Sequence, residues 1–281
     1  MSRMKRGWAL AKKSWSVLRE HPTLIRFPLY GGALTLLMAI VVVGPGLYLI
    51  DDGKLAPGAP LVVIGFLLLS FIGTYFAVAL AAAADRIFRG EEATVADGLA
   101  VSRANIGPIF GWAILSATVG LIFSLLENQG IIGQIVGRLL NVAWSLITFL
   151  AVPVIAIEGT GPIETLKRSG SLFRERWGQQ ITGNIAIGGL VALAGFLPAI
   201  LLIVLGIGLW GASGFLGALL VIVGIILFAI SALIASALNG IFGVALYHYA
   251  GEGATIGPFT TAELESAVKR TGGGGPAPST I

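Results

Sequence analysis

Long apolar stretches alternate along this chain with short segments rich in Lys, Arg and Trp. A helix needs about 20 mostly apolar residues to cross a bilayer. Six stretches meet this requirement, and they cover residues 29–50, 61–83, 106–126, 135–157, 181–209 and 215–247. Strands that alternate apolar and polar residues are absent from the sequence pattern, which argues against a membrane barrel. The pattern therefore predicts an all-α polytopic membrane protein whose six spans form three helical hairpins.

Composition agrees with this interpretation. The chain is 56% hydrophobic and only 11% charged, whereas soluble domains carry about 25% charged residues. One soluble core of this length cannot hide so much apolar surface, so bilayer hydrocarbon is the expected solvent. The chain contains no cysteine, which excludes disulfides and thiolate chemistry.

The basic residues are distributed unevenly between the loops. Of the 18 Lys and Arg residues, all but Lys54 and Arg138 fall on one side of the six-span topology. Because cytoplasmic loops carry the excess of Lys and Arg, both termini are expected in the cytoplasm of a cell membrane. An even number of spans fits this arrangement, whereas five or seven would not.

Residues 3–20 are predicted to form a basic amphipathic helix. On a helical wheel the apolar and basic residues separate into two halves, with Trp8 and Trp15 on the apolar side. Such a helix suits the headgroup region of a membrane. A cleaved signal peptide is disfavoured because no cleavage site follows, and a nucleic-acid arm leaves both Trp unexplained. The candidate lipid contacts are Lys5, Arg6, Trp8, Lys12, Lys13 and Trp15.

An amphipathic helix is also predicted before each of the other two hairpins. Residues 163–177 separate on the wheel in the same way, and Pro162 suits the first helical position. A weaker stripe follows Thr94, a candidate N-cap with Asp97 in the first turn. The further lipid candidates are Lys167, Arg168, Arg174 and Trp177. Anionic lipids at the cytoplasmic face are the expected ligands, and no cofactor, metal or nucleic acid is expected.

Short matches link these three segments. They pair Leu10 with Ser14, Leu99 with Ser102, and Leu166 with Ser169. They favour a threefold repeat of interfacial helix plus hairpin, with a period of about 80 residues. The alternative is that any six-helix protein has amphipathic loops.

Two segments carry a family resemblance. "GWALAKKSWSVLREHPTLIRFPL" and "AAAADRIFRGEEATVADGLAVSRA" resemble an uncharacterised family of bacterial and archaeal six-helix membrane proteins. A looser likeness is to the membrane domain of some glycerophosphodiester phosphodiesterases. The resemblance implies a membrane location and a fold, and it carries no activity.

Few polar residues lie within the predicted spans. Asn141, Asn184 and Asn239 are expected to hydrogen-bond between helices. Arg138 is expected to pair with Glu127 or to extend its charge toward the interface. At the cytoplasmic ends, Asp85 and Glu158 are interpreted as surface ion-pair residues.

The chain end and the two histidines offer little chemistry. His248, in "YHY", is interpreted as an interfacial belt residue. Residues 1–250 are predicted to form one membrane domain, and residues 251–281 a cytoplasmic tail. A capping box from Thr260 to Glu263 predicts a short helix over 261–270, followed by a disordered end.

Three functions are compatible with the sequence. The first is a non-catalytic scaffold or module that associates with lipid or with a protein partner, including a second copy. The second is a small-solute transporter or channel, which the absence of Asp, Glu and Lys at mid-depth disfavours. The third is a membrane-embedded lipid-related enzyme, which no residue pattern supports. The expectation is therefore a protein that is not an enzyme.

Overall fold

The computed structural model describes residues 3–127, 130–177, 195–211, 213–261 and 264, and these residues form helices and connecting turns without a strand. The described helices are α1 (Arg3–Glu20), η1 (Pro22–Ile25), α2 (Arg26–Met38), η2 (Ala39–Val43), α3 (Gly44–Asp51), α4 (Leu55–Phe88), α5 (Val95–Ala104), α6 (Ile106–Glu127), α7 (Gly130–Thr148), α8 (Ala151–Glu158), α9 (Pro162–Trp177), α11 (Leu197–Leu209) and α12 (Gly214–Glu252). The all-helical class is confirmed for this part of the chain.

Five helical segments are long and apolar enough to cross a membrane. They are Pro22–Asp51, Leu55–Phe88, Ile106–Glu127, Gly133–Glu158 and Gly214–Glu252. They coincide with five of the six predicted spans, and most extend a few residues beyond the predicted bounds. The sixth, over 181–209, lies largely outside the described residues, which include only its second part as α11. These helices indicate a multi-pass membrane protein.

Prolines explain two irregular points within the spans. The first span is one helical run in which η2 is a π-helical turn immediately before Gly44 and Pro45. Proline has no backbone N–H, and its ring clashes with the carbonyl four residues earlier, so a wider turn relieves the clash. Pro153 accounts for the break between α7 and α8, because it cannot donate to the carbonyl of Phe149.

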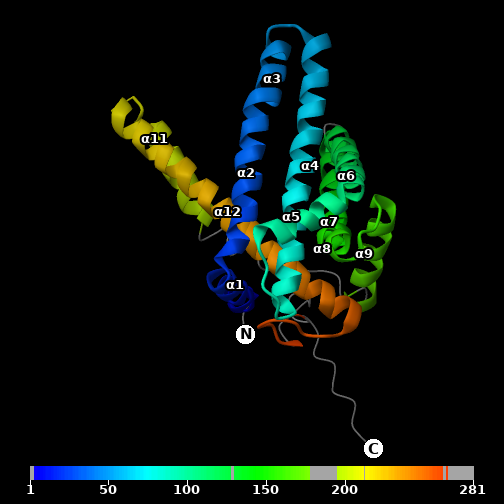
Figure 1. Ribbon diagram of the computed structural model, residues 1–281. Coiled ribbons are helices and arrows are strands. Elements are labelled where there is room, and N and C mark those ends of the chain that lie inside the picture. Colours follow the sequence, from blue (N-terminus) through cyan, green and yellow to red (C-terminus); the bar gives the residue numbers. More distant parts are fainter. Residues whose placement is uncertain (1–2, 128–129, 178–194, 212, 262–263, 265–281) are drawn as a thin grey trace, which may run out of the picture.

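The hairpins diverge from a shared base (Figure 1). The α2–α3 and α4 hairpin points to the top of the view, the α11–α12 hairpin diverges to the upper left, and α1 lies at the bottom near the N-terminus. The shared base is built from the C-terminal parts of α4, α8 and α12, which contact one another. We call this end, where α1, α5 and α9 also pack, the basic end.

Small side chains allow the close packing at this base. Every residue of α4 from Val78 to Ala84 is at most 5% exposed, and four of them form the run Ala81–Ala84. A Cβ on Gly240 of α12 would lie 2.5 Å from the Leu80 side chain, so the glycine lets this side chain pack directly against the α12 backbone. Farther from the base, large apolar side chains are exposed, among them Ile40, Leu139 and Val204. Within the most apolar 18 residues of each candidate span, only 11% to 33% are buried within the chain, which is typical of helices that present their remaining surface to hydrocarbon.

The tail prediction lies mostly outside the described residues. Of the predicted helix over 261–270, only Thr261 and Leu264 are described. Phe259 and Leu264, the apolar residues that flank the predicted capping box, are 3% and 0% exposed. Glu263 lies outside the described residues, so the predicted capping box stays a prediction.

Candidate functional site

The apolar side of α1 packs against the protein itself. Helix α1 ends at Glu20 and Pro22 begins η1, as the sequence predicts. The buried residues of α1 face α12 and η1, and they are Leu10, Ala11, Ser14, Val17 and Leu18. Lys12 and Arg19 are exposed, and Trp15 is 45% exposed. Lys12, Arg19 and Trp15 are therefore accessible from outside the protein, whereas the buried apolar residues of α1 are covered by the protein itself. Lys13 is half-buried, and the side chains of Lys5, Arg6 and Trp8 lie outside the description.

Helix α9 also has a side that is buried against the protein and a side with exposed basic residues. Pro162 opens the helix as predicted, and its buried residues are Thr165, Ser169, Leu172 and Phe173. Lys167 and Arg174 are exposed. Arg168 instead binds a carboxylate, because its Nε lies 2.8 Å from Glu158 Oε1. That hydrogen bond raises the pKa of the Arg168 guanidinium. The side chain of Trp177 is outside the description.

Helix α5 begins with the expected cap. The Asp97 backbone N–H donates to Thr94 Oγ1, and Asp97 Oδ2 accepts from the Thr94 backbone N–H at 2.9 Å. The two bonds form a reciprocal capping box, which satisfies donors left free at a helix start. Hydrogen bonds from Thr94 lower the pKa of the Asp97 carboxyl. The sequence prediction of this helix start is confirmed.

The three serines matched in the sequence are all buried. Ser14, Ser102 and Ser169 are each 0% exposed. The Ser102 hydroxyl donates to the Tyr75 carbonyl of α4 at 2.8 Å, and the Ser169 hydroxyl donates to the Ile147 carbonyl of α7. The Ser14 hydroxyl has no hydrogen-bond partner within the described structure. Thus α5 and α9 are each tied to the last span of the preceding hairpin.

A buried hydrogen-bonded pair joins the first and third hairpins. His248 Nε2 of α12 lies 2.5 Å from Asp85 Oδ1 of α4. Asp85 Oδ2 accepts from Arg89 Nε at 3.0 Å, and Glu252 Oε2 lies 3.4 Å from His248 Nδ1. The His248 side chain is 3% exposed and the Asp85 side chain 12%. His248 is therefore not a residue of an interfacial belt, and Asp85 is not a surface residue, because each group is buried against the other.

A second polar contact joins the second and third hairpins. The Tyr247 hydroxyl of α12 donates to Glu158 Oε1 at 2.6 Å, and the same oxygen accepts from Arg168. Five residues thus connect α4, α8, α9 and α12 at the basic end: Asp85, Glu158, Arg168, Tyr247 and His248. The sequence patterns alone do not pair these residues. Asp85 and His248 are 163 positions apart, and Glu158 and Tyr247 are 89 apart. Asp85 lies five residues before Gly90, and His248 lies five residues before Gly253; both glycines have positive φ. This common spacing is a sequence signal that could have assigned the two residues to matching positions.

The predicted intramembrane residues lie on the outside of the bundle. Asn141 and Arg138 of α7 and Asn239 of α12 are exposed, and Asn184 lies outside the described residues. Within the described part of the chain no ion pair joins Arg138 to Glu127; Gly137 packs against the Glu127 side chain. The structure therefore brings none of the described candidates together.

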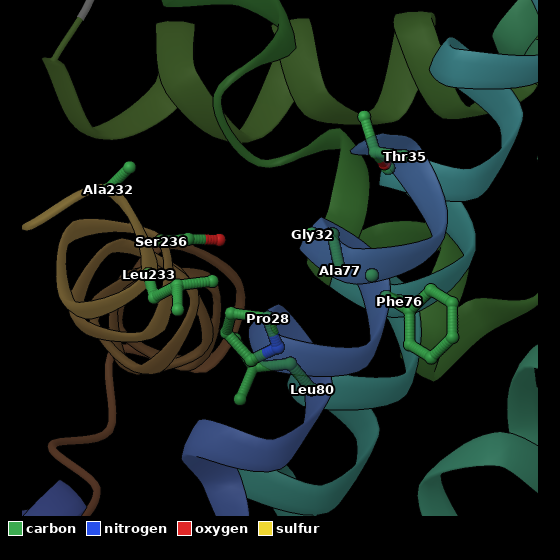
Figure 2. Close-up of a pocket in the computed structure, with 11 residues that line it drawn as sticks. Pro28, Gly32, Thr35, Phe76, Ala77, Leu80, Ala232, Leu233 and Ser236 are labelled. Carbon is green, nitrogen blue, oxygen red and sulfur yellow. The ribbon is translucent and has the colours of Figure 1, made fainter. Parts of the chain in front are cut away.

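An apolar groove separates α12 from the α2–α4 hairpin. Figure 2 shows α12 on one side and α2 with α4 on the other, with the Ser236 hydroxyl directed into the gap. The groove has a volume of about 220 Å³. Small residues form much of its lining, including Gly32, Gly73, Ala77 and Ala232. Gly32, Gly73 and Ser236 are exposed, so the groove opens to the outside of the bundle. Among the described residues no cluster of His, Asp and Glu is suited to hold a metal ion.

Most of the chain matches a known protein family. Residues 58–257 match a family of unknown function, DUF6159. The chain belongs to this family. The sequence resemblance to an uncharacterised family is thereby confirmed, whereas the looser likeness to a phosphodiesterase membrane domain is not shown. No curated protein matches the chain. Membership leaves the activity open, because a fold by itself does not assign a function.

Proposed function

We propose that this protein is a non-catalytic integral membrane protein that associates with anionic lipids through its basic end. The observation that carries the proposal is the set of exposed cations on α1 and α9. Lys12, Arg19, Lys167 and Arg174 have no carboxylate partner among the described residues. Trp15 is exposed on the same helix as Lys12. Juxtamembrane Lys and Arg attract anionic headgroups, and Trp prefers the interface.

The proposed orientation places the basic end in the cytoplasm. The opposite ends of the spans carry only Lys54 and Arg138, and Lys54 is paired with Asp52 at 2.7 Å. This difference between the two ends supports cytoplasmic termini through the positive-inside rule.

We also infer that the chain is a threefold repeat closed into a ring. In support, α5 contacts α4, α9 contacts α7 and α8, and α1 contacts α12. Each of these three helices would then pack on the second span of a hairpin, with α1 closing the ring on the last one. The buried Ser14, Ser102 and Ser169 occupy matching places in this arrangement. Such a ring is a rigid frame for displaying basic helices.

The test compares the lipid preference of matched charge variants. The protein and its variants are placed in nanodiscs that contain phosphatidylglycerol and phosphatidylcholine, and the retained lipids are identified by native mass spectrometry. Lys12→Gln with Lys167→Gln should reduce the preference for phosphatidylglycerol by roughly fivefold for each lysine at about 0.1 M salt.

The matched control removes the same charge from the other end. Lys54→Gln with Arg138→Gln should leave the preference within about twofold of the unmodified protein, since screening limits the reach of these charges to about 10 Å. Equal loss in the two double variants would contradict a specific role for the basic end. No preference for phosphatidylglycerol in the unmodified protein would contradict the proposed function.

A further inference from the structure

One side of α7 carries a continuous row of polar side chains. Four residues follow one another at intervals of four, three and four positions: Gln134, Arg138, Asn141 and Ser145. At 100° per residue they fall within an arc of about 60° on the helix. All four are exposed, and all lie within the candidate span Gly133–Glu158. We call these four residues the polar stripe.

The polar stripe is unsatisfied within the described part of the chain. The Ser145 hydroxyl donates to the Asn141 carbonyl of its own helix at 2.8 Å. No hydrogen bond or ion pair joins the side chains of Gln134, Arg138 or Asn141 to another described residue. Hydrocarbon offers such groups no hydrogen bonds, and polar residues in membrane spans normally face protein or water. The stripe therefore calls for a polar partner.

The length and spacing of the stripe indicate that this partner is a helix. Alternating intervals of four and three are those of the a and d positions through which two parallel helices meet. From Gln134 to Ser145 the stripe is about 17 Å long at a rise of 1.5 Å per residue. The headgroup region on each side of a bilayer is only about 5–8 Å thick, so a lipid headgroup would cover one end of the stripe and leave the rest in hydrocarbon.

A second copy of this chain supplies matching groups at matching depths. Copies share one orientation in a membrane, so each α7 presents the same residues at the same level. The amides of Gln134 and Asn141 both donate and accept, and each can therefore pair with its own counterpart. A carboxylate also lies at the level of Arg138: the Glu127 side chain packs against Gly137 and makes no ion pair with a described residue.

We propose that the protein forms a two-fold dimer through the polar stripe, in which the amides pair across the seam and Arg138 of each copy binds Glu127 of the other copy. A two-fold interface uses the same face of both subunits, so one stripe on α7 is sufficient. This inference goes beyond the proposed lipid association and does not depend on it. In such a dimer the basic ends of both copies lie on the same side of the membrane.

The first experiment cross-links the seam in native membranes. The chain has no native cysteine, and a disulfide requires Cα atoms within about 7 Å of each other. Ser145→Cys should therefore give a disulfide-linked dimer under mild oxidation. Ala143→Cys is the matched control, because Ala143 is also small and exposed but lies about 160° around the helix from Ser145. No cross-link at Ser145→Cys, or equal cross-linking at both positions, would overturn the dimer.

The second experiment tests the ion pair between copies by charge reversal. Glu127→Arg and Arg138→Glu each place like charges across the seam, so each variant alone should lose the dimer in native mass spectrometry from detergent micelles. Co-expression of the two variants should restore it as a heterodimer, since both ion pairs then join opposite charges. A pair within one chain would stay like-charged in each variant, so a mixture that remains monomeric would overturn the placement of Arg138.

The same spectra identify the alternative occupant. An unmodified protein that is monomeric and retains an anionic lipid, with that lipid lost in Arg138→Gln, would overturn the dimer in favour of a headgroup on the stripe. The proposed function is measured separately, by the phosphatidylglycerol preference that Lys12 and Lys167 control, so either proposal can fail without the other.

Discussion

Asp85 and His248 are groups that are costly to bury, and each is buried with the other as its partner. Removing one member of a buried pair leaves the other unpaired in a medium of low polarity, which is far more costly than losing a surface pair. The pair also bridges α4 and α12, so its loss would be felt between hairpins. Local sequence patterns do not predict this pairing, because the two residues are 163 positions apart along the chain.

Replacing Asp85 should therefore destabilise the bundle strongly. Asp85→Asn is expected to lower the free energy of unfolding by about 3–5 kcal/mol, measured by denaturant unfolding in detergent micelles. The control is Asp52→Asn, whose partner Lys54 is 61% exposed, and it should change stability by less than about 1 kcal/mol. Equal losses in the two variants would mean that the buried pair stabilises the fold no more than a surface ion pair does.

The serines allow a test with opposite signs. Ser102→Ala removes a buried hydrogen bond to α4 and should cost about 1 kcal/mol. Ser14→Ala removes a buried hydroxyl that has no partner in the described structure, so it should be neutral or stabilising by about 1 kcal/mol. Thermal unfolding of both variants in the same detergent decides the matter. A loss for Ser14→Ala as large as that for Ser102→Ala would reveal a hydrogen bond from α1 to the protein.

Among the elements, α5 depends most on its first turn. The helix has 10 residues, a length at which isolated helices are marginal, so packing and capping must hold it. Its start at Thr94 could be predicted from sequence because a capping box is a local pattern. The apolar stripe of α5 was weak in the sequence, because two of its close contacts with α4 are made by a glycine and a serine, Gly98 and Ser102.

Removing the cap should loosen α5 selectively. Thr94→Ala is expected to cost about 1 kcal/mol, seen as faster hydrogen exchange of the amides of Val95–Ala104. Thr118→Ala on α6 is the control, since its hydroxyl only bonds within its own helix. The pKa of Asp97 is lowered in the folded protein. The capping contribution is therefore complete above the ordinary Asp pKa of about 3.9, and it is lost as pH falls through the lowered value. Unchanged exchange at pH 7 in Thr94→Ala would contradict this account.

At the scale of the whole molecule, the two ends of the bundle differ in charge and in packing. The basic end has a core of tightly packed alanine-rich helices and internal ion pairs. The hairpins diverge away from it, as Figure 1 shows for α11–α12 and the α2–α4 hairpin. This asymmetry predicts a fixed orientation in the membrane.

Cysteine labelling can read that orientation directly, because the chain has no native cysteine. A single Cys at Asp52, in the turn between α3 and α4, should react with an impermeant maleimide in intact cells. A single Cys at Glu92, between α4 and α5, should react only after permeabilisation. Both positions are exposed, so access to the solvent is comparable. The opposite pattern of labelling would reverse the proposed topology.

The sequence by itself determined the helical class, five of the spans and the starts of α5 and α9, because these depend on local hydropathy, proline and capping. It also located the excess of Lys and Arg. The tertiary structure decided what the apolar sides of α1 and α9 contact. Helix α1 packs against α12, and helix α9 packs against α7 and α8, so these sides are buried within the protein. It also decided the Asp85–His248 pairing and the groove at Gly73. Those features join residues far apart in the chain, and only the packing of helices brings such residues within a few ångströms of one another.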